Sequence, residues 1–116
     1  KTGGWFMVVD KGDNPLNFVD PSGTAMFVYS IQRGVELGLL KAKEYTPVAY
    51  RGYQSLFPFI QVNDRGLLDV IGACDGVVIK KNFVEYVIVP KILNAKEAVA
   101  GILWAAVIME TEQLKK

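Results

Sequence analysis

Apolar side chains crowd the segment that follows Asp20 and Pro21, and few polar residues interrupt them. Asp20 suits the cap of a helix, and Pro21 suits its first position. The apolar positions are Ala25, Met26, Phe27, Tyr29, Ile31, Val35 and Leu39. The solvated stripe has only three members, Gln32, Arg33 and Glu36. This pattern predicts a helix that is buried on most of its sides.

A second helix is predicted to begin at Thr46 and Pro47, because proline favours the first turn of a helix. Apolar residues follow at near-helical spacing, namely Val48, Tyr50, Tyr53, Leu56, Phe57 and Ile60. Pro58 should kink this helix or end it early, since proline has no amide hydrogen to donate. We interpret Tyr50 and Tyr53 as packing residues of this helix.

The other segments before the last helix are short and bounded by turn residues. Residues 3–9 are aromatic and β-branched, which predicts an extended segment. Residues 63–66 form a turn, and the apolar residues Leu67, Leu68, Val70 and Ile71 after it predict one or two short strands. Residues 73–81 favour a loop, and residues 83–89 are β-prone up to Pro90. The sequence therefore predicts small hairpins between the helices.

The last helix is predicted to start at a capping box formed by Asn94 and Glu97 and to run to about Leu114. In that arrangement Asn94 accepts from an amide one turn on, and Glu97 reaches back. Trp104 and Met109 are assigned to the core or to a partner-facing surface. The predicted inner face comprises Ala98, Val99, Ile102, Leu103, Ala106 and Val107. Three buried helices joined by small hairpins fit one part of a helical toroid, in which paired helices stack around a ring.

Composition excludes several classes of function. The length of 116 residues suffices for one domain. The charge is nearly balanced, with 13 Lys and Arg residues and 12 Asp and Glu residues, so the chain lacks the basic stripe that nucleic-acid binders carry. Histidine is absent and Cys74 is the single cysteine, so we expect no metal site, no disulfide and no cofactor. No apolar run has the length of a membrane span. With no signal peptide visible and one lone cysteine, we expect a cytoplasmic protein.

Two stretches of the chain resemble one enzyme family. Residues 4–10, Gly-Trp-Phe-Met-Val-Val-Asp, look like the Gly-Leu-Trp-Tyr-Gln-Val-Leu-Asp stretch of the unsaturated rhamnogalacturonyl hydrolases, relatives of the unsaturated glucuronyl hydrolases. Residues 17–29, Asn-Phe-Val-Asp-Pro-Ser-Gly-Thr-Ala-Met-Phe-Val-Tyr, are similar to that family's Asn-Tyr-x-Glu-x-Ser-Gly-Thr-Ala-Met-Phe-Val-Tyr. Shorter similarities follow in order, around Tyr53, Gly66, Cys74, Tyr86 and Glu110. The resemblance covers essentially the whole chain.

The resemblance implies a fold and a reaction. The family's members are (α/α)6 barrels of about three times this length. Residues 1–116 would then be the C-terminal segment of one glycoside hydrolase domain, mainly α-helical with a short β-hairpin. Such enzymes remove an unsaturated uronic acid from pectin-derived (rhamnogalacturonan) oligosaccharides, as an aspartic acid protonates the double bond and water adds to give an unstable hemiketal. The catalytic aspartates lie earlier in the barrel, so the resemblance assigns no catalytic residue here and implies that this chain alone is inactive.

The sequence departs from the family pattern at several positions. Asp20 stands where the family has glutamate, and Ala73 stands where it has threonine before the cysteine. Residues 87–91 are apolar where the family has a Tyr-rich segment. These departures bear on substrate preference around Cys74 and Tyr86.

Six residues are candidate substrate contacts, namely Trp5, Asp20, Ser22, Gly23, Cys74 and Asp75. Ser22 and Gly23 lie at a helix start, where amides suit a carboxylate or sugar oxygen or belong to a plain helix cap. Trp5 can stack on a sugar or pack in the core. Cys74 and Asp75 lie in a loop, where binding groups are frequent, yet a free cysteine is more often a small buried apolar residue.

Two functions of different class remain open. In the first, this chain completes a glycoside hydrolase barrel with the missing N-terminal part and contributes binding loops for an unsaturated uronate-containing oligosaccharide. In the second, it is a non-catalytic helical remnant whose apolar faces bind another protein or a second copy of itself. The short length, the absence of histidine and the apolar content of 51% motivate the second hypothesis.

Overall fold

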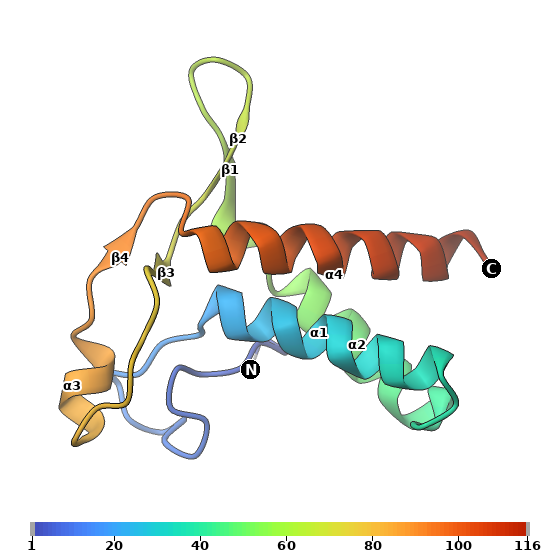
Figure 1. Cartoon of the computed structure of the whole chain (residues 1–116), viewed down its shortest axis with the longest axis horizontal. Coiled ribbons are helices and arrows are strands. Elements are labelled where there is room, and N and C mark those ends of the chain that lie inside the picture. The colour runs from blue at the N-terminus through green and yellow to red at the C-terminus, as the bar shows by residue number, and fades with distance from the viewer. Residues whose placement is uncertain (1, 116) are drawn as a thin grey trace.

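Three long helices and two small antiparallel sheets make up residues 2–115, the part of the chain that this computed structural model describes (Figure 1). The helices are α1 (Pro21–Glu36), α2 (Ala42–Gln54), the short α3 (Phe83–Val87) and α4 (Lys96–Leu114), with a 3-10 turn, η1, at Phe57–Phe59. One sheet pairs β1 (Ile60–Val62) with β2 (Leu68–Val70), and the other pairs β3 (Ala73–Cys74) with β4 (Lys91–Ile92). The predicted turn at residues 63–66 is present, whereas in the first segment only Phe6 forms a β-bridge, with Val19, and residues 7–9 bend and turn.

Helices α1 and α4 lie side by side and run in the same direction, whereas α2 runs back against them (Figure 1). Ser22 and Glu97, from the first turns of α1 and α4, line one hollow. At the other end, Oε1 of Glu36 lies 3.7 Å from Nζ of Lys115. The two helix starts therefore meet at one end of the molecule, and the two helix ends meet at the other.

The core lies where these three helices meet, and its buried members include Ala25, Val28, Ala49, Tyr53, Leu56, Ala98, Ile102, Ala105 and Met109. Two glycines allow helices to pack closely against each other. A Cβ added to Gly52 of α2 would lie 2.7 Å from Cγ2 of Val28 and 2.8 Å from the ring of Trp5. A Cβ added to Gly101 of α4 would lie 3.2 Å from Cβ of Ala25. An alanine at Gly52 would therefore overpack the contact between α1 and α2.

Helix α2 begins earlier than the sequence pattern predicted. It starts at Ala42, so Pro47 lies inside the helix and not at its first position. Residues 42–44, Ala-Lys-Glu, favour helix and extend it backwards toward the end of α1. Pro47 removes one main-chain hydrogen bond without ending the helix. The helix ends at Gln54, ahead of Pro58, which belongs to η1.

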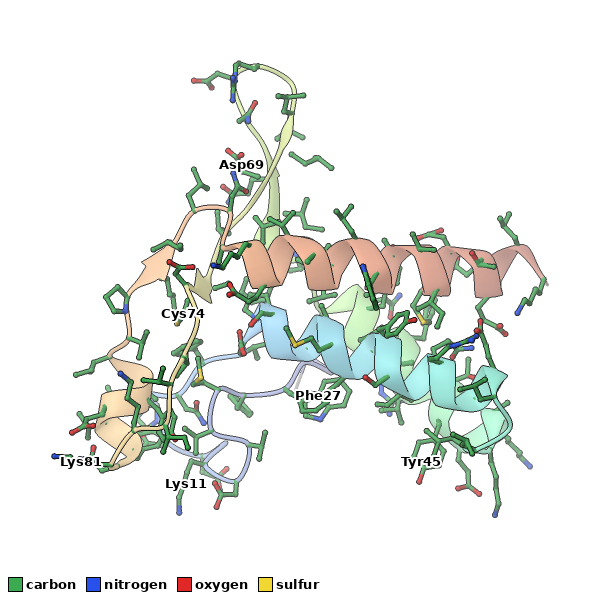
Figure 2. All side chains as sticks on the ribbon, viewed as in Figure 1. Lys11, Phe27, Tyr45, Asp69, Cys74 and Lys81 are labelled. Carbon is green, nitrogen blue, oxygen red and sulfur yellow. The ribbon has the colours of Figure 1, made fainter. Side chains whose placement is uncertain are left out.

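The predicted capping box at the start of the last helix is wrong. Ala95 occupies the cap position, and its side chain forms no cap hydrogen bond. Asn94 adopts a left-handed backbone conformation with a φ of 54°, which asparagine tolerates. Its side chain accepts from the amide of Val70 at 2.7 Å and donates to Asp69 at 2.9 Å, at the base of the hairpin (Figure 2). A long-range bond to the hairpin has thus replaced the local cap.

Within residues 83–89, predicted as β-prone, Phe83–Val87 form the short helix α3 instead. The side chain of Asn82 accepts from the amide of Glu85 at 3.1 Å and caps this helix. Two residues of the predicted loop, Ala73 and Cys74, pair with β4 as the strand β3. A local cap therefore outweighs the β-propensity of valine here, in line with the strong context dependence of that propensity.

Two predicted helix faces also need correction. Gln32, predicted to be solvated, is fully buried, and its Oε1 and Nε2 have no hydrogen-bond partner within residues 2–115. It lies one turn after Val28, on the stripe of α1 that faces the core. On α4, Leu103 and Val107 were assigned to the inner face but are 60% and 69% exposed, whereas Ala105 is buried. Because α4 is apolar on every side, its sequence does not reveal which side is covered.

Tyr53 joins α2 to α4, because its hydroxyl donates to Oε1 of Glu110 at 2.8 Å. Burial raises the pKa of Tyr53 to about 12, with further contributions from this hydrogen bond and from the charge of Glu110. The pKa of an unperturbed tyrosine is 10.0. Tyr53 therefore keeps its proton in the folded chain over a range of pH in which the unfolded chain loses it.

We expect the free energy of unfolding to fall by up to about 3 kcal/mol as the pH rises through the folded pKa of Tyr53. The stabilisation is fully present below the unfolded pKa and disappears above the folded one, because the unfolded chain releases the proton first. Urea unfolding of the wild type and of Tyr53→Phe at a series of alkaline pH values measures this difference. A wild type and variant with the same pH dependence would contradict the expectation.

Candidate functional site

The starts of α1 and α4, together with the loop after β3, enclose a hollow of about 190 Å³. Its lining comprises Met7, Asp20, Ser22, Met26, Cys74, Gly76, Val77 and Glu97. Figure 2 shows Cys74 at this end of the molecule, beside the starts of both helices. Four separate stretches of sequence contribute to the lining, so the tertiary fold builds this site. Three of the six predicted contacts, Asp20, Ser22 and Cys74, come together here.

Asp20 caps α1, as the sequence predicted. Its Oδ1 accepts from the amide and the hydroxyl of Ser22 at 3.1 and 2.9 Å, and its Oδ2 accepts from the amide of Gly23 at 3.2 Å. The amides of Ser22 and Gly23 therefore donate to Asp20 and not to an outside oxygen. Two groups can still accept a hydrogen bond from a ligand. They are the carboxylate of Asp20, through its remaining lone pairs, and the hydroxyl oxygen of Ser22.

Cys74 forms a buried part of the wall and is a free thiol. Its Sγ lies 3.6 Å from the carbonyl oxygen of Val89, to which the thiol donates. Burial raises the pKa of the Cys74 thiol, the charge of Asp20 raises it further, and Lys91 acts in the opposite direction. A raised pKa keeps the thiol protonated and therefore poorly nucleophilic. Cys74 thus serves this site as a small apolar surface.

Glu97 belongs to the site, although its sequence pattern pointed to a capping role. Its Oε1 lies 3.9 Å from the place where a Cβ on Gly76 would stand, so the side chain reaches toward the loop across the hollow. Its Oε2 is buried and has no hydrogen-bond partner among the described residues. Burial of a carboxylate oxygen without a partner is costly. The arrangement therefore favours a donor supplied from outside this chain.

The other three predicted contacts lie around the hollow and not on its wall. Trp5 packs against the core, with its ring centroid 5.3 Å from that of Phe27, and its amide donates to Oγ1 of Thr24 at 2.9 Å. Phe27 lies on the underside of α1 in Figure 2. Gly23 is held within the helix cap, and Asp75 is exposed in the loop after β3. These contacts favour the packing interpretation of Trp5.

A larger hollow of about 540 Å³ continues along the seam between α1 and α4. It shares Met26 and Glu97 with the first hollow and extends to Tyr29 and Trp104. The rings of Tyr29 and Trp104 meet edge to face, with their centroids 5.0 Å apart. We call the two hollows together the trough. Carboxylates at one end and aromatic rings at the other suit a polyhydroxylated ring compound, because hydroxyls donate to carboxylates and apolar ring faces pack on aromatic side chains.

The sequence model of glycosyl hydrolase family 88 matches residues 1–113 of this chain. The chain belongs to this family. A family 105 glycoside hydrolase from C. acetobutylicum ATCC 824 has a similar structure, with a TM-score of 0.83 and 27% sequence identity. The similarity covers 93% of the family 88 chain and 32% of the C. acetobutylicum hydrolase, so our chain spans about a third of the length of that enzyme.

These findings confirm the resemblance and the fold that it implied. The family 88 chain is mainly α-helical with a short β-hairpin and forms part of an (α/α)6 barrel. Helices α1 and α4 are parallel neighbours, and the antiparallel α2 packs against both of them. Val28 of α1 faces Gly52 of α2, whereas Met26 and Ser30, two residues to either side, point to the opposite face. The trough therefore lies on the side of α1 that is turned away from α2.

Two further properties of the family 88 chain bear on its chemistry. Within residues 2–115, no three side chains of the His, Cys, Asp and Glu types gather in a way that could hold a metal ion. In the same range, no helix combines the length and the apolar character needed to cross a membrane.

The side chains of the trough are suited to binding, since they offer acceptors and apolar surface.

Proposed function

We propose that this chain supplies one wall of the sugar-binding site of a hydrolase that removes an unsaturated uronic acid from rhamnogalacturonan-derived oligosaccharides by hydrating its double bond. The buried, unpartnered Oε2 of Glu97 carries the proposal. A sugar hydroxyl is a suitable donor for it, because hydrogen bonds to a carboxylate are strong. Family membership supports a glycosidase, and the ordered motif similarity supports the choice of substrate class.

The trough is open on one side, so this wall contacts only one part of the substrate. Complete small-molecule sites have volumes of about 300–1,000 Å³ and bury most of their ligand. The hollow at Asp20 and Glu97 has only about 190 Å³ and continues into the open 540 Å³ hollow. A sugar ring that lies over Met26 would direct its hydroxyls to the carboxylates and its apolar face toward Trp104. The opposite wall would come from the other helices of the barrel.

The proton-transfer chemistry is assigned to the part of the barrel outside this chain. Protonation of a double bond requires an acid positioned over the substrate. Asp20 accepts three hydrogen bonds as a helix cap and is held in that role. Cys74 is a protonated thiol that donates to Val89. The partner implied by this division is therefore the remainder of the barrel, which would bring the acid to the sugar held here.

The isolated 116-residue chain is expected to release no product from an unsaturated rhamnogalacturonan disaccharide, whereas a full-length parent protein that contains it is expected to do so. The measurement is the loss of the ultraviolet absorbance of the double bond in each sample. Turnover by the isolated chain would place the acid within these 116 residues and contradict the proposal. A parent that hydrolyses an unsaturated glucuronyl substrate and leaves the rhamnogalacturonan disaccharide intact would overturn the substrate assignment alone.

A further inference from the structure

The strand pair β3–β4 places Lys91 beside the wall of the trough. In this antiparallel pair Cys74 lies directly opposite Lys91, and both strands lie next to the start of α4 (Figure 1). Directly opposed residues point to the same face of a sheet, with their Cβ atoms about 4.5–5.5 Å apart. Cys74 belongs to the wall of the hollow of about 190 Å³. The side chain of Lys91 therefore leaves the backbone within reach of a ligand in that hollow.

The ammonium group of Lys91 is held in place by an aromatic ring. Its Nζ lies 3.9 Å from the centroid of the Phe18 ring. A cation–π contact of this kind orients an ammonium group and leaves its charge intact. Lys91 is exposed, and its ammonium takes part in none of the ion pairs that residues 2–115 form. Lys91 thus presents an oriented positive charge that an anion can approach.

The charge of Lys91 also acts on the wall itself. Burial and the charge of Asp20 raise the pKa of the Cys74 thiol, whereas the charge of Lys91 lowers it. Asp20 follows Phe18 by two residues, so the ring that supports Lys91 and a carboxylate of the wall belong to one short stretch. A positive and a negative side chain therefore lie at the same end of the trough.

The hollow alone is poorly suited to a carboxylate. Its described lining contains the carboxylates of Asp20 and Glu97 and neither lysine nor arginine. A ligand carboxylate placed against them would be repelled, because charges in a partly buried site are weakly screened. Two other lysines point elsewhere, since Lys81 lies beside α3, away from Cys74, in Figure 2, and Lys96 lines the groove between α4 and the β1–β2 hairpin. Lys91 is the cation best placed to receive a carboxylate at the edge of the trough.

We propose that Lys91 binds the carboxylate of the unsaturated uronate and thereby selects acidic over neutral terminal sugars. The inference rests on the proposed function and adds to it an orientation of the substrate. The uronate lies at the β3–β4 end of the trough, with its hydroxyls toward Asp20 and Glu97 and its carboxylate toward Lys91. The sugar that follows it extends along the seam between α1 and α4. Hydrogen bonds between an ammonium and a carboxylate are among the strong ones, so Lys91 makes a large difference between an acidic and a neutral sugar.

A full-length parent protein that carries Lys91→Met tests this assignment, because methionine keeps an apolar side chain of similar length and removes the charge. The variant is assayed with the unsaturated disaccharide and with its methyl ester, in which the carboxylate is blocked. KM for the acid is expected to rise about tenfold, since a charge-assisted hydrogen bond is lost. KM for the ester should not change, because the ester does not make this bond in the wild type. If the ester is bound without turnover, its inhibition constant takes the place of KM.

Two further variants separate recognition of the carboxylate from a structural role. Lys91→Arg should restore the preference for the acid, because a guanidinium also donates to a carboxylate. Lys81→Met is the matched control, since it removes the same charge beside α3 and away from Cys74 (Figure 2). It should leave both KM values unchanged. Equal helix content by circular dichroism establishes that each variant is folded.

A loss of the preference for the acid in Lys91→Met alone supports the proposal. An unchanged KM in Lys91→Met, or equal rises for the acid and the ester, would overturn the role of Lys91. If Glu97→Ala still raised KM in that case, the proposed function would stand without Lys91. A wild-type parent that hydrolyses neither compound would overturn the proposed function, and the assignment of Lys91 with it.

Discussion

Replacement of Leu56 by alanine is expected to lower the free energy of unfolding of this chain by about 3 kcal/mol. Leu56 is among the largest side chains that are fully buried. It lies between the end of α2 and η1, next to Phe57, whose ring packs against Tyr53 with the centroids 5.2 Å apart. Because this contact holds its neighbours in place, the cavity left by the deleted atoms cannot collapse completely. The lost burial and the residual cavity together account for the magnitude.

Urea unfolding of the wild type and of Leu56→Ala, followed by circular dichroism, measures this loss. Leu39→Ala is the matched control, because it makes the same chemical change at a side chain that is 76% exposed. That control should cost less than about 0.5 kcal/mol. Equal losses in the two variants would contradict the position of Leu56 in the core between the helices.

In a full-length parent protein, Glu97→Ala is expected to raise KM for the unsaturated disaccharide about ten- to hundredfold, with a smaller change in kcat. A hydrogen bond from a sugar hydroxyl to a charged carboxylate contributes about 1.5–3 kcal/mol, and about 1.4 kcal/mol corresponds to a tenfold change. A group that binds the ground state and the transition state equally affects KM. Glu97→Gln should recover part of the affinity, because its amide oxygen still accepts a hydrogen bond.

Glu112→Ala is the matched control for Glu97→Ala, because it removes a carboxylate from the other end of the same helix. Glu112 lies 3.6 Å from Nζ of Lys115, at the end of α4 remote from the trough. Steady-state kinetics of this variant should give an unchanged KM. If Glu97→Ala lowered kcat while KM stayed constant, Glu97 would take part in the chemical step, and its assignment as a binding group would be wrong.

Local signals predicted those features of the fold that depend on interactions within a single turn. Asp20 caps α1 through the two amides that follow it in the sequence, so the start of this helix is visible from residues 20–23 alone. The turn at residues 63–66 is equally local, since Oδ1 of Asn63 accepts from the amides of Arg65 and Leu67. In both places the short polar side chain and its donors are neighbours in the sequence.

Long-range contacts decided the features that the sequence did not predict. Asn94 has the right residue type for a helix cap, but the amide of Val70 and the carboxylate of Asp69 occupy its side chain. Gln32 is polar, yet its position one turn after Val28 places it in the core. No sequence pattern reveals the partners of Asn94, because they lie 24 and 25 positions away and meet it only after the helix and the hairpin have packed.

The candidate site likewise contains residues that sequence signals predicted and one that only the tertiary fold reveals. Asp20, Ser22 and Cys74 were predicted from family motifs and do line one hollow, whereas Glu97 emerges only because the starts of α1 and α4 meet. A carboxylate in the first turn of a helix is a visible signal, but it does not indicate which other helix start lies beside it. That information resides in the parallel arrangement of α1 and α4.

A crystal structure of a full-length parent bound to an unsaturated rhamnogalacturonan disaccharide tests the central claim most directly. The predicted result is a sugar in the trough between α1 and α4, with one of its hydroxyls donating to the Oε2 of Glu97 and another close to Asp20 or Ser22. A disaccharide bound away from the trough, with Glu97 hydrogen-bonded only to protein groups, would contradict the claim that this chain forms a wall of the sugar-binding site.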